Sequence, residues 1–176
     1  MNIISDRLIL RALEPSDKLL LRKIINDPET EYMLGGWSFP VSEKDQDEWY
    51  ASLKTNSGAL RCMIADINDP GKAFGTVMLT DIDYKNGTAE IHIKLAAGEA
   101  RGKGYGAEAV SAMVNYAFDE LRLHCIYARV NDYNLPSRKM FEKCGFKKEG
   151  ILRGRFYKQG KYVDVFSYSV LKEDTH

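Results

Sequence analysis

The sequence has no long apolar run and few cysteines, and each shortage excludes a class of protein. No stretch approaches the roughly 20 consecutive apolar residues that a membrane-spanning helix needs, and the start, MNIISDRLIL, lacks the basic and apolar regions of a secretory signal. Cys62, Cys125 and Cys144 are odd in number and widely spaced, which suits reduced core thiols better than a disulfide framework or a zinc site. We therefore expect a cytoplasmic protein with no metal and no membrane partner.

The sequence also lacks a net charge and any linker between domains. The 25 Lys and Arg residues balance the 25 Asp and Glu residues, so the whole chain exerts no general attraction on nucleic acid, and no nucleic-acid partner is expected. No repeat, low-complexity tract or linker interrupts the 176 residues. This predicts a single domain spanning residues 1–176.

The charges are nevertheless distributed unevenly. Residues 27–48 hold seven acidic side chains and one lysine, whereas residues 99–161 hold thirteen Lys and Arg against seven acidic side chains. Solvated helix faces explain most charges of this kind. The sharper interpretation places a cationic partner beside the first segment and an anionic partner beside the second.

Hydrophobic periodicity predicts the order of the elements. Alternating residues predict strands at 7–13, 59–65, 73–83 and 89–95, and helical spacing predicts helices that begin at Pro15 and Ser42. The second half alternates: helix 104–121, strand 125–131, helix 135–144, and a last pair of strands around YKQGKY. The fold class is α/β, a mixed sheet flanked by helices, antiparallel in its first half and with a βα crossover in its second.

The loop GEARGKGYGAEAV, residues 98–110, lies between a strand and the longest predicted helix. Glycines leave room for a ligand to approach the backbone, and the free amides of a helix N-terminus attract anions. No Walker loop occurs, since G-x-x-x-x-G-K-[ST] is absent. Gly102, Gly104 and Ala107 formally fit a dinucleotide fingerprint with Asp132 after it, but an antiparallel hairpin precedes the loop instead of a parallel βαβ unit.

RGKGYG resembles the R/Q-x-x-G-x-G/A motif of the GNAT acetyltransferase superfamily. AEIHIKL before it and ARVNDYNLPSRKMFEKCGFKKEGILR after it are similar to the branch with ribosomal-protein N-terminal acetyltransferases and spermidine acetyltransferases. The resemblance implies a partly splayed sheet and acetyl-CoA as the acetyl donor. The acceptor would be a primary amine: a polyamine, another small cationic amine, or a protein or peptide N-terminus. It would attack directly in a ternary complex, since no G-x-S-x-G elbow is present. Relatives are often dimers, so a homodimer is possible by analogy.

The resemblance also implies which residues hold acetyl-CoA. Backbone amides of the glycine loop would bind its pyrophosphate, the main chain of the preceding strand would pair with pantetheine, and two asparagines would bond the pantetheine arm, although the second could equally cap a helix. The loop residues are Arg101, Gly102, Lys103, Gly104, Tyr105 and Gly106; the strand residues are Ile93, Lys94 and Leu95; the asparagines are Asn131 and Asn134.

Glu90, His92 and Ser137 are the candidates for catalysis. Glu90 and His92 share one face of a strand with Lys94, because side chains alternate in direction along a strand. Three ionisable side chains on one face are also ordinary for a strand face exposed to solvent. If that face lines a cleft, Glu90 is the first candidate for the base that accepts the amine's proton and His92 the second. The family pattern N-x-x-[AS]-x-x-x-Y-E-x-x-G-F has Phe141 in place of its tyrosine acid. Ser137 lies one turn earlier, where the resemblance to the ribosomal-protein branch implies a serine as proton donor, although it could equally be an ordinary first-turn residue beside Pro136. A CoA-binding sensor without turnover is the alternative function.

The acceptor pocket is expected to involve the segment before the first sheet strands. Glu31, Trp37 and Phe39 are its candidate residues, and the acidity of this segment favours a cationic acceptor. Arg153, Arg155 and Asp164 fall in a stretch typical of this branch, and the sequence assigns them no role.

Overall fold

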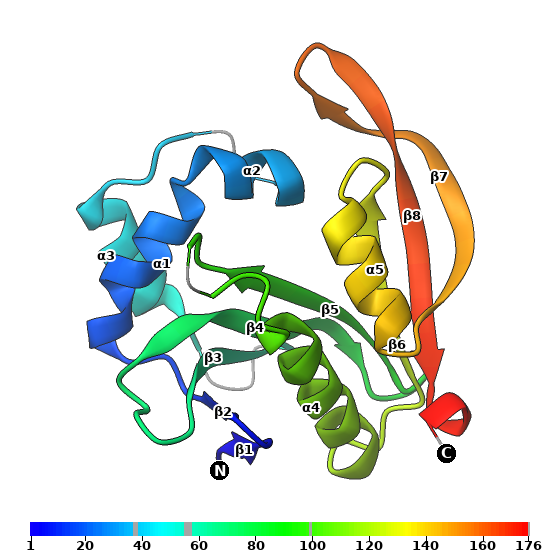
Figure 1. Ribbon diagram of the computed structural model, residues 1–176, viewed down its shortest axis with the longest axis horizontal. Coiled ribbons are helices and arrows are strands. Elements are labelled where there is room, and N and C mark those ends of the chain that lie inside the picture. The colour runs from blue at the N-terminus through cyan, green and yellow to red at the C-terminus, as the bar shows by residue number, and fades with distance from the viewer. Residues whose placement is uncertain (37–38, 55–57, 99, 176) are drawn as a thin grey trace.

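The computed structural model describes residues 1–36, 39–54, 58–98 and 100–175, and it shows an eight-stranded sheet flanked by helices (Figure 1). The strand order is β1-β2-β3-β4-β5-β6-β8-β7, and only β5 and β6 pair in parallel. The strands are β1 (Ile3–Ile4), β2 (Leu8–Arg11), β3 (Leu60–Asp66), β4 (Ala73–Asp83), β5 (Thr88–Leu95), β6 (Cys125–Asn131), β7 (Lys147–Lys158) and β8 (Lys161–Leu171). The predicted mixed sheet with a βα crossover is confirmed.

The helices follow the prediction with one addition. They are α1 (Lys18–Ile25), α2 (Pro28–Leu34), α3 (Glu43–Ser52), α4 (Tyr105–Asp119) and α5 (Leu135–Lys143). Helix α2 was not predicted, although Asp27 caps it by accepting the Thr30 amide and Pro28 stands in its first turn. Its seven residues are too few to show an apolar stripe. No helix in the described ranges is both long and apolar enough to cross a membrane.

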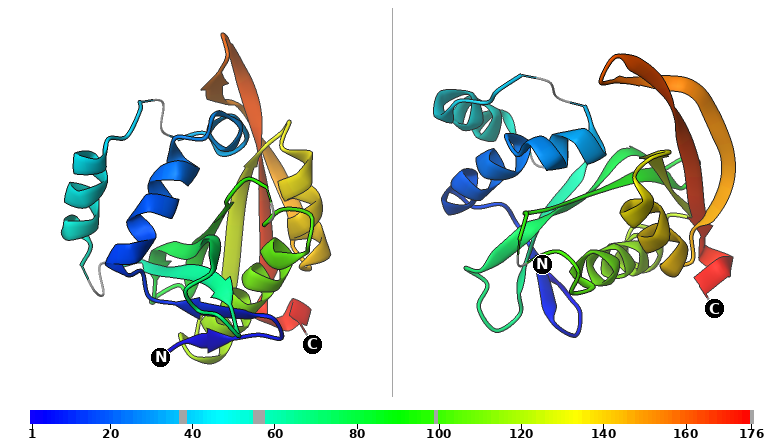
Figure 2. Two further views of the ribbon diagram at one scale, coloured as in Figure 1. Left: turned by 60° about the vertical axis from the view of Figure 1, so that its left-hand side comes forward. Right: turned by 45° about the horizontal axis from the view of Figure 1, so that its top comes forward.

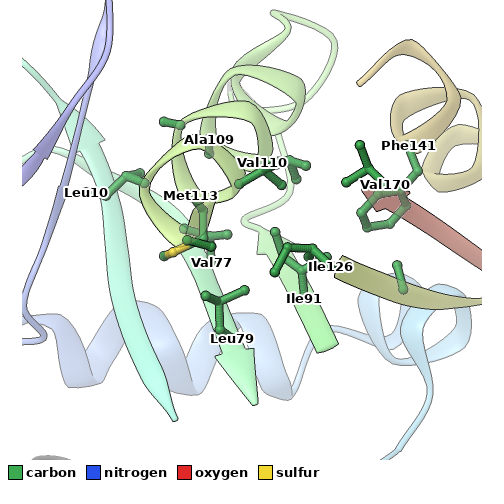
Figure 3. Close-up of a cluster of buried hydrophobic side chains, with 14 of the residues drawn as sticks. Leu10, Val77, Leu79, Ile91, Ala109, Val110, Met113, Ile126, Phe141 and Val170 are labelled. Carbon is green, nitrogen blue, oxygen red and sulfur yellow. The ribbon is translucent and has the colours of Figure 1, made fainter. Parts of the chain in front are cut away.

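The core lies between the sheet and α4. Helices α1 and α3 lie on one face of the sheet and α4 on the other (Figure 2). Val110 and Met113 of α4 are fully buried and point toward Val77 and Ile91 of the sheet (Figure 3). The spacing of α4's apolar residues predicted this stripe. The packed helix fixes the position of the glycine loop at its N-terminus.

The sheet opens between its two central strands. Strands β5 and β6 pair only from Thr88 to Glu90, opposite Cys125 to Tyr127. Beyond this point β5 stays paired with β4, and β6 with β8. The rest of β5 therefore presents an unpaired backbone edge toward β6.

The last two strands form a long hairpin that reaches back over the N-terminal helices (Figure 1). The ladder between them shifts register between Leu152 and Phe156, where Gly154 has φ +54° and its amide donates to Asp164 Oδ1 at 2.8 Å. This bulge changes the direction of β7. The Phe156 ring then lies directly on Gly35 after α2, where an added Cβ would meet it at 2.1 Å.

Candidate active site

A cleft of about 600 Å³ opens where β5 and β6 part. Ile93 and Leu95 of β5, the start of α4 at Gly106, and Ser137 and Met140 of α5 line it, and α2 borders it. Most of the surface that lines the cleft is apolar, whereas the glycine loop at one end offers backbone amides. The cleft thus suits an extended ligand with a polar, anionic end and a thinner apolar arm.

The glycine loop supplies a row of free amides to this cleft. Gly102 and Gly104 have φ values of +77° and +80°, a region that favours glycine. Within the described ranges, no residue accepts a hydrogen bond from the amides of residues 102–107. The Arg101 amide, in contrast, donates to the Gly98 carbonyl at 3.2 Å. Arg101 uses its amide inside the turn, so the free amides that could bind an anion begin at Gly102, and the anion site stays a prediction.

A clamp from the start of the chain holds the loop in place. The Arg7 guanidinium donates to the Lys103 carbonyl at 3.0 Å and to Glu108 Oε2 at 2.7 Å, and it lies over the Tyr105 ring. Ser5 also donates to Glu108, at 2.7 Å. Burial raises the pKa of the Glu108 carboxyl, but the bonds from Arg7 and Ser5 outweigh burial, so its pKa is lowered overall. No local pattern predicts this clamp, since its two sides lie 96 to 103 positions apart in the sequence.

Lys103 and Tyr105 thus act through the loop backbone, and neither side chain lines the cleft among the described residues. The Tyr105 ring stacks on Phe74 with centroids 4.5 Å apart. The Arg101 guanidinium does line the cleft, but it bonds Glu29 Oε1 at 3.0 Å and Thr30 Oγ1 at 2.8 Å.

Two lysines that the sequence analysis missed line the cleft from α5. Lys139 and Lys143 stand one turn apart, and neither forms a hydrogen bond or ion pair with any residue that the structure describes. Their spacing of four on a predicted helix was the available signal. Both are suited to bind phosphate oxygens that extend beyond the glycine loop.

The open edge of β5 fixes which amides reach the cleft. The Ala96 amide donates to the Phe74 carbonyl of β4 at 2.8 Å, and backbone groups alternate in direction along a strand. By this alternation the amides of Ile93 and Leu95 point away from β4 toward the cleft. Lys94 points its backbone to β4, where its carbonyl would lie 2.0 Å from a Cβ at Gly75. The prediction that the Lys94 main chain pairs with the ligand is therefore corrected, because its backbone groups face β4 and are not available to a ligand in the cleft.

A second cavity of about 450 Å³ adjoins the cleft. His92 and Lys94 of β5, Arg129 of β6, and Arg155 and Phe156 of β7 line it. We call it the acceptor cavity. Leu34, Ile93 and Ser137 line both spaces, so the two meet at the point where the sheet opens.

Glu90, the first candidate for the base, is committed to an ion pair. Its side chain is 3% exposed, and both carboxylate oxygens accept from Arg129, one of them from Nε at 2.9 Å. Both oxygens of this carboxylate are engaged by the guanidinium, and Glu90 does not line the acceptor cavity. The order of the two candidates is therefore reversed, and Glu90 instead orients Arg129 beside the cavity.

His92 is the better placed base. Its Nε2 lies 2.9 Å from Thr80 Oγ1 and 3.9 Å from Glu90 Oε2. Burial lowers the pKa of this imidazole below its ordinary value of 6.5, Lys94 and Arg129 lower it further, and Glu90 and Asp81 act in the opposite direction. The imidazole is consequently neutral at neutral pH and can accept a proton.

Comparisons with known proteins agree with this geometry. The family model described as an acetyltransferase (GNAT) domain matches residues 7–147. The chain belongs to the GNAT acetyltransferase family. It is 34% identical over 172 residues to the uncharacterized N-acetyltransferase p20 of Bacillus licheniformis, covering 97% of this chain and 96% of that one. It is 31% identical to spermidine N(1)-acetyltransferase of Vibrio cholerae, over 96% and 95% of the two chains.

A solved structure supports the same assignment. The crystal structure of spermidine N-acetyltransferase from Vibrio cholerae in complex with CoA and spermine superposes with a TM-score of 0.86 at 29% identity, covering 95% of this chain and 96% of the other. The predicted family and the N-acetyltransferase class are both confirmed. This neighbour, which has the same fold, holds CoA in its structure.

Phe141 occupies the position of the tyrosine in the GNAT pattern. It is 3% exposed, packs edge to face on Phe146 at 5.0 Å, and lines the acceptor cavity. Ser137 lies one turn earlier, and its amide donates to the Asn134 side chain at 3.2 Å. The Ser137 hydroxyl makes no hydrogen bond to any residue in the described part of the chain.

The two asparagines predicted to bond pantetheine tie α2 to the start of α5. Asn134 caps α5, which was one of the two roles expected for it. Its Nδ2 donates to the Met33 carbonyl at 3.1 Å. Asn131 donates to the same carbonyl at 3.4 Å and to the Tyr133 hydroxyl at 3.1 Å. Contact with pantetheine stays a prediction for both residues, and it requires some of these bonds to be exchanged.

The acidic segment that favoured a cationic acceptor is neutralised by its neighbours. Every one of its seven carboxylates has a partner: six lie within 4.0 Å of a cation, and the seventh, Asp45, bonds the start of a helix. The pairs are Asp27 and Glu29 with Arg101, Glu31 with Lys158, Glu43 with Arg22, Asp47 with Lys18 and Glu48 with Lys44. Asp27 also caps α2. The segment therefore does not face the acceptor cavity as free negative charge.

The three candidate acceptor residues have different outcomes. Glu31 pairs with Lys158 near the tip of the β7–β8 hairpin, which links α2 to that hairpin. Phe39 is 72% exposed and does not line the acceptor cavity. Trp37 lies outside the described residues. Phe156, which lies against Gly35 and lines the cavity, was not predicted.

The three cysteines are free thiols, as predicted. Burial raises the pKa of the Cys62 thiol to about 11, and it also raises the pKa values of Cys125 and Cys144. A thiol whose pKa is raised is a weak nucleophile at neutral pH. These three side chains are thus poor candidates for a covalent acetyl carrier.

Proposed function

We propose that this protein transfers the acetyl group of acetyl-CoA to a primary amine by direct attack in a ternary complex. The observation that carries the proposal is the junction at Ser137 and Ile93, which line both the donor cleft and the acceptor cavity. A thioester in the cleft and an amine in the cavity would meet there. No covalent intermediate is needed for this geometry.

Each step has a candidate group in this chain. His92 accepts the proton of the ammonium and leaves a neutral amine. The open-edge amides of Ile93 and Leu95 stabilise the oxyanion that forms when the amine attacks the carbonyl. Ser137 donates a proton to the departing thiolate, and the proton that the attacking nitrogen still carries passes through water to reprotonate the serine. The C–S bond breaks as the oxyanion collapses to the amide, and no oxidant or reductant takes part.

The donor site fits acetyl-CoA in its chemistry. The amides of residues 102–107 and the α4 dipole suit the pyrophosphate, and Lys139 and Lys143 suit a further phosphate. Relatives include spermidine acetyltransferases, which supports a small amine as the acceptor.

The alternative function is a CoA-binding sensor, which Phe141 in place of the family's tyrosine keeps open. Thiol release from acetyl-CoA, measured with a panel of polyamines, aminoglycosides, amino acids and short peptides, separates the two. We expect release that depends on one class of amine. Tight CoA binding without thiol release for any amine would support the sensor instead.

The pH dependence tests the role of His92. In the wild type, kcat should fall as the pH drops through a value below 6.5, because the lowered pKa keeps the imidazole neutral above that value. His92→Gln should lower kcat about tenfold at neutral pH and remove this acid limb. The measurement is kcat between about pH 5 and 8 at saturating amine. An unchanged profile in the variant would assign the limb to another group.

A further inference from the structure

The acceptor cavity is lined by cations without matching anions. Lys94, Arg129 and Arg155 line it together with His92, and no Asp or Glu does so among the described residues. Arg129 is neutralised by Glu90. Trp and Ser occupy the undescribed positions 37–38 of the nearby loop, so neither can supply a carboxylate there.

Lys94 is the central feature of this charge pattern. It is partly buried on β5, two residues from His92 and on the same face, and it forms no hydrogen bond or ion pair within the described part of the chain. Burial without a counter-charge lowers its pKa from 10.5. A buried lysine of this kind destabilises the protein until an anion joins it. Arg155, at the exposed rim, is likewise unpaired in the described residues.

An apolar cavity of about 690 Å³ continues beyond Lys94. It lies between α1, α3 and the strands β3 and β4, and its mainly apolar walls include Leu21, Ile24 and Trp49, with the charged residues Asp45, Glu48 and Arg61 also lining it. Lys94 and Met78 line both this space and the acceptor cavity. The two spaces therefore adjoin at Lys94, which borders both.

We propose that the acceptor is an amino acid with a large apolar side chain, whose carboxylate pairs with Lys94 while its amine lies near His92 and its side chain enters the apolar cavity. The inference rests on the proposed acetyl transfer and names its substrate class. An α-amino acid holds its amine and carboxylate on one carbon, which matches the adjacent positions of His92 and Lys94 on one strand face. A polyamine would instead bring two or more positive charges next to unpaired cations, and like charges repel in a partly buried site.

The test compares amines that differ only in the carboxylate. Thiol release is measured with purified full-length protein, acetyl-CoA and phenylalanine, phenylalaninamide, phenethylamine, leucine, leucinamide, glycine and spermidine. We expect kcat/KM for phenylalanine or leucine to exceed those of the matching amide and of glycine by about tenfold or more. The amides are the less basic amines and hold more neutral amine at pH 7, so this comparison is biased against the proposal.

Variants of Lys94 then assign the preference to its charge. Lys94→Met should lower kcat/KM for the amino acid about tenfold and equalise acid and amide, whereas Lys94→Arg should retain the preference. The dissociation constant for acetyl-CoA should stay unchanged in both, and Lys85→Met, in an exposed turn, should match the wild type.

Two failures are distinguishable. Faster turnover of spermidine or of the amides than of the amino acids would overturn the inference and leave acetyl transfer standing, and so would an acid preference that persists in Lys94→Met. No thiol release with any amine would overturn acetyl transfer and the inference with it.

Discussion

Gly104→Val is expected to weaken acetyl-CoA binding by roughly 100-fold or more. Gly104 stands directly before α4 with φ +80°, and its own amide is one of the free amides of residues 102–107. A β-branched residue cannot hold this conformation at low cost, so the loop would rearrange and lose at least two bonds to the pyrophosphate. Each bond to a charged group contributes about 1.5–3 kcal/mol. Isothermal titration with acetyl-CoA measures the loss.

Gly160→Val is the matched control. Gly160 has φ +82° in the turn between β7 and β8, and no atom lies within 4 Å of an added Cβ. The backbone strain is the same in both variants, about 1–2 kcal/mol, so both should lower the melting temperature by a few degrees. Only Gly104→Val should lose acetyl-CoA affinity. Equal affinities in the two variants would contradict the assignment of the glycine loop to the pyrophosphate.

Ser137→Ala is expected to lower kcat about 100-fold with little change in acetyl-CoA affinity. The hydroxyl stands where cleft and acceptor cavity meet, and a positioned general acid contributes factors of this size. Alanine preserves the amide that Asn134 caps, so α5 should still form. Stopped-flow thiol release gives kcat, and titration gives the affinity. Ser111→Ala, on an exposed position of α4, serves as the control.

A second variant separates a lost acid from a damaged site. Phe141 lies one turn beyond Ser137 and lines the acceptor cavity, so Phe141→Tyr restores the hydroxyl of the family pattern. In the Ser137→Ala background it should recover part of kcat. If Ser137→Ala alone keeps the wild-type kcat, water protonates the thiolate and the serine has no acid role.

Much of the fold was predictable because its signals are local. The helical spacing of α4, the antiparallel hairpin before the glycine loop and the alternation of β5 each depend on residues close in sequence. What escaped prediction was short or lacked a pattern: β1 has two residues, and α2 has seven with a single buried side chain, Thr30. Their signals were a cap and a proline instead of a period.

The donor and acceptor sides of the site also differ in how far local sequence patterns predict them. The position of the glycine loop before α4 could be predicted because strand, turn and helix are contiguous, and its role in binding acetyl-CoA stays a prediction. The roles of Glu90 and His92 could not be ranked, since the choice depends on Arg129, 39 positions away in sequence. The pairing of the acidic segment could not be predicted for the same reason, because its cations come from α1, the glycine loop and β7 as well as from α3 itself.

The sequence by itself determined the fold class and the family, and it predicts an anion site at the glycine loop, since glycines before a helix leave backbone amides free. Only the tertiary structure decided what lines the acceptor cavity. It paired the acids, placed Phe156 on Gly35 and left Lys94 without a counter-charge among the described residues. Charge is neutralised by neighbours in space, and those neighbours come from distant parts of the chain.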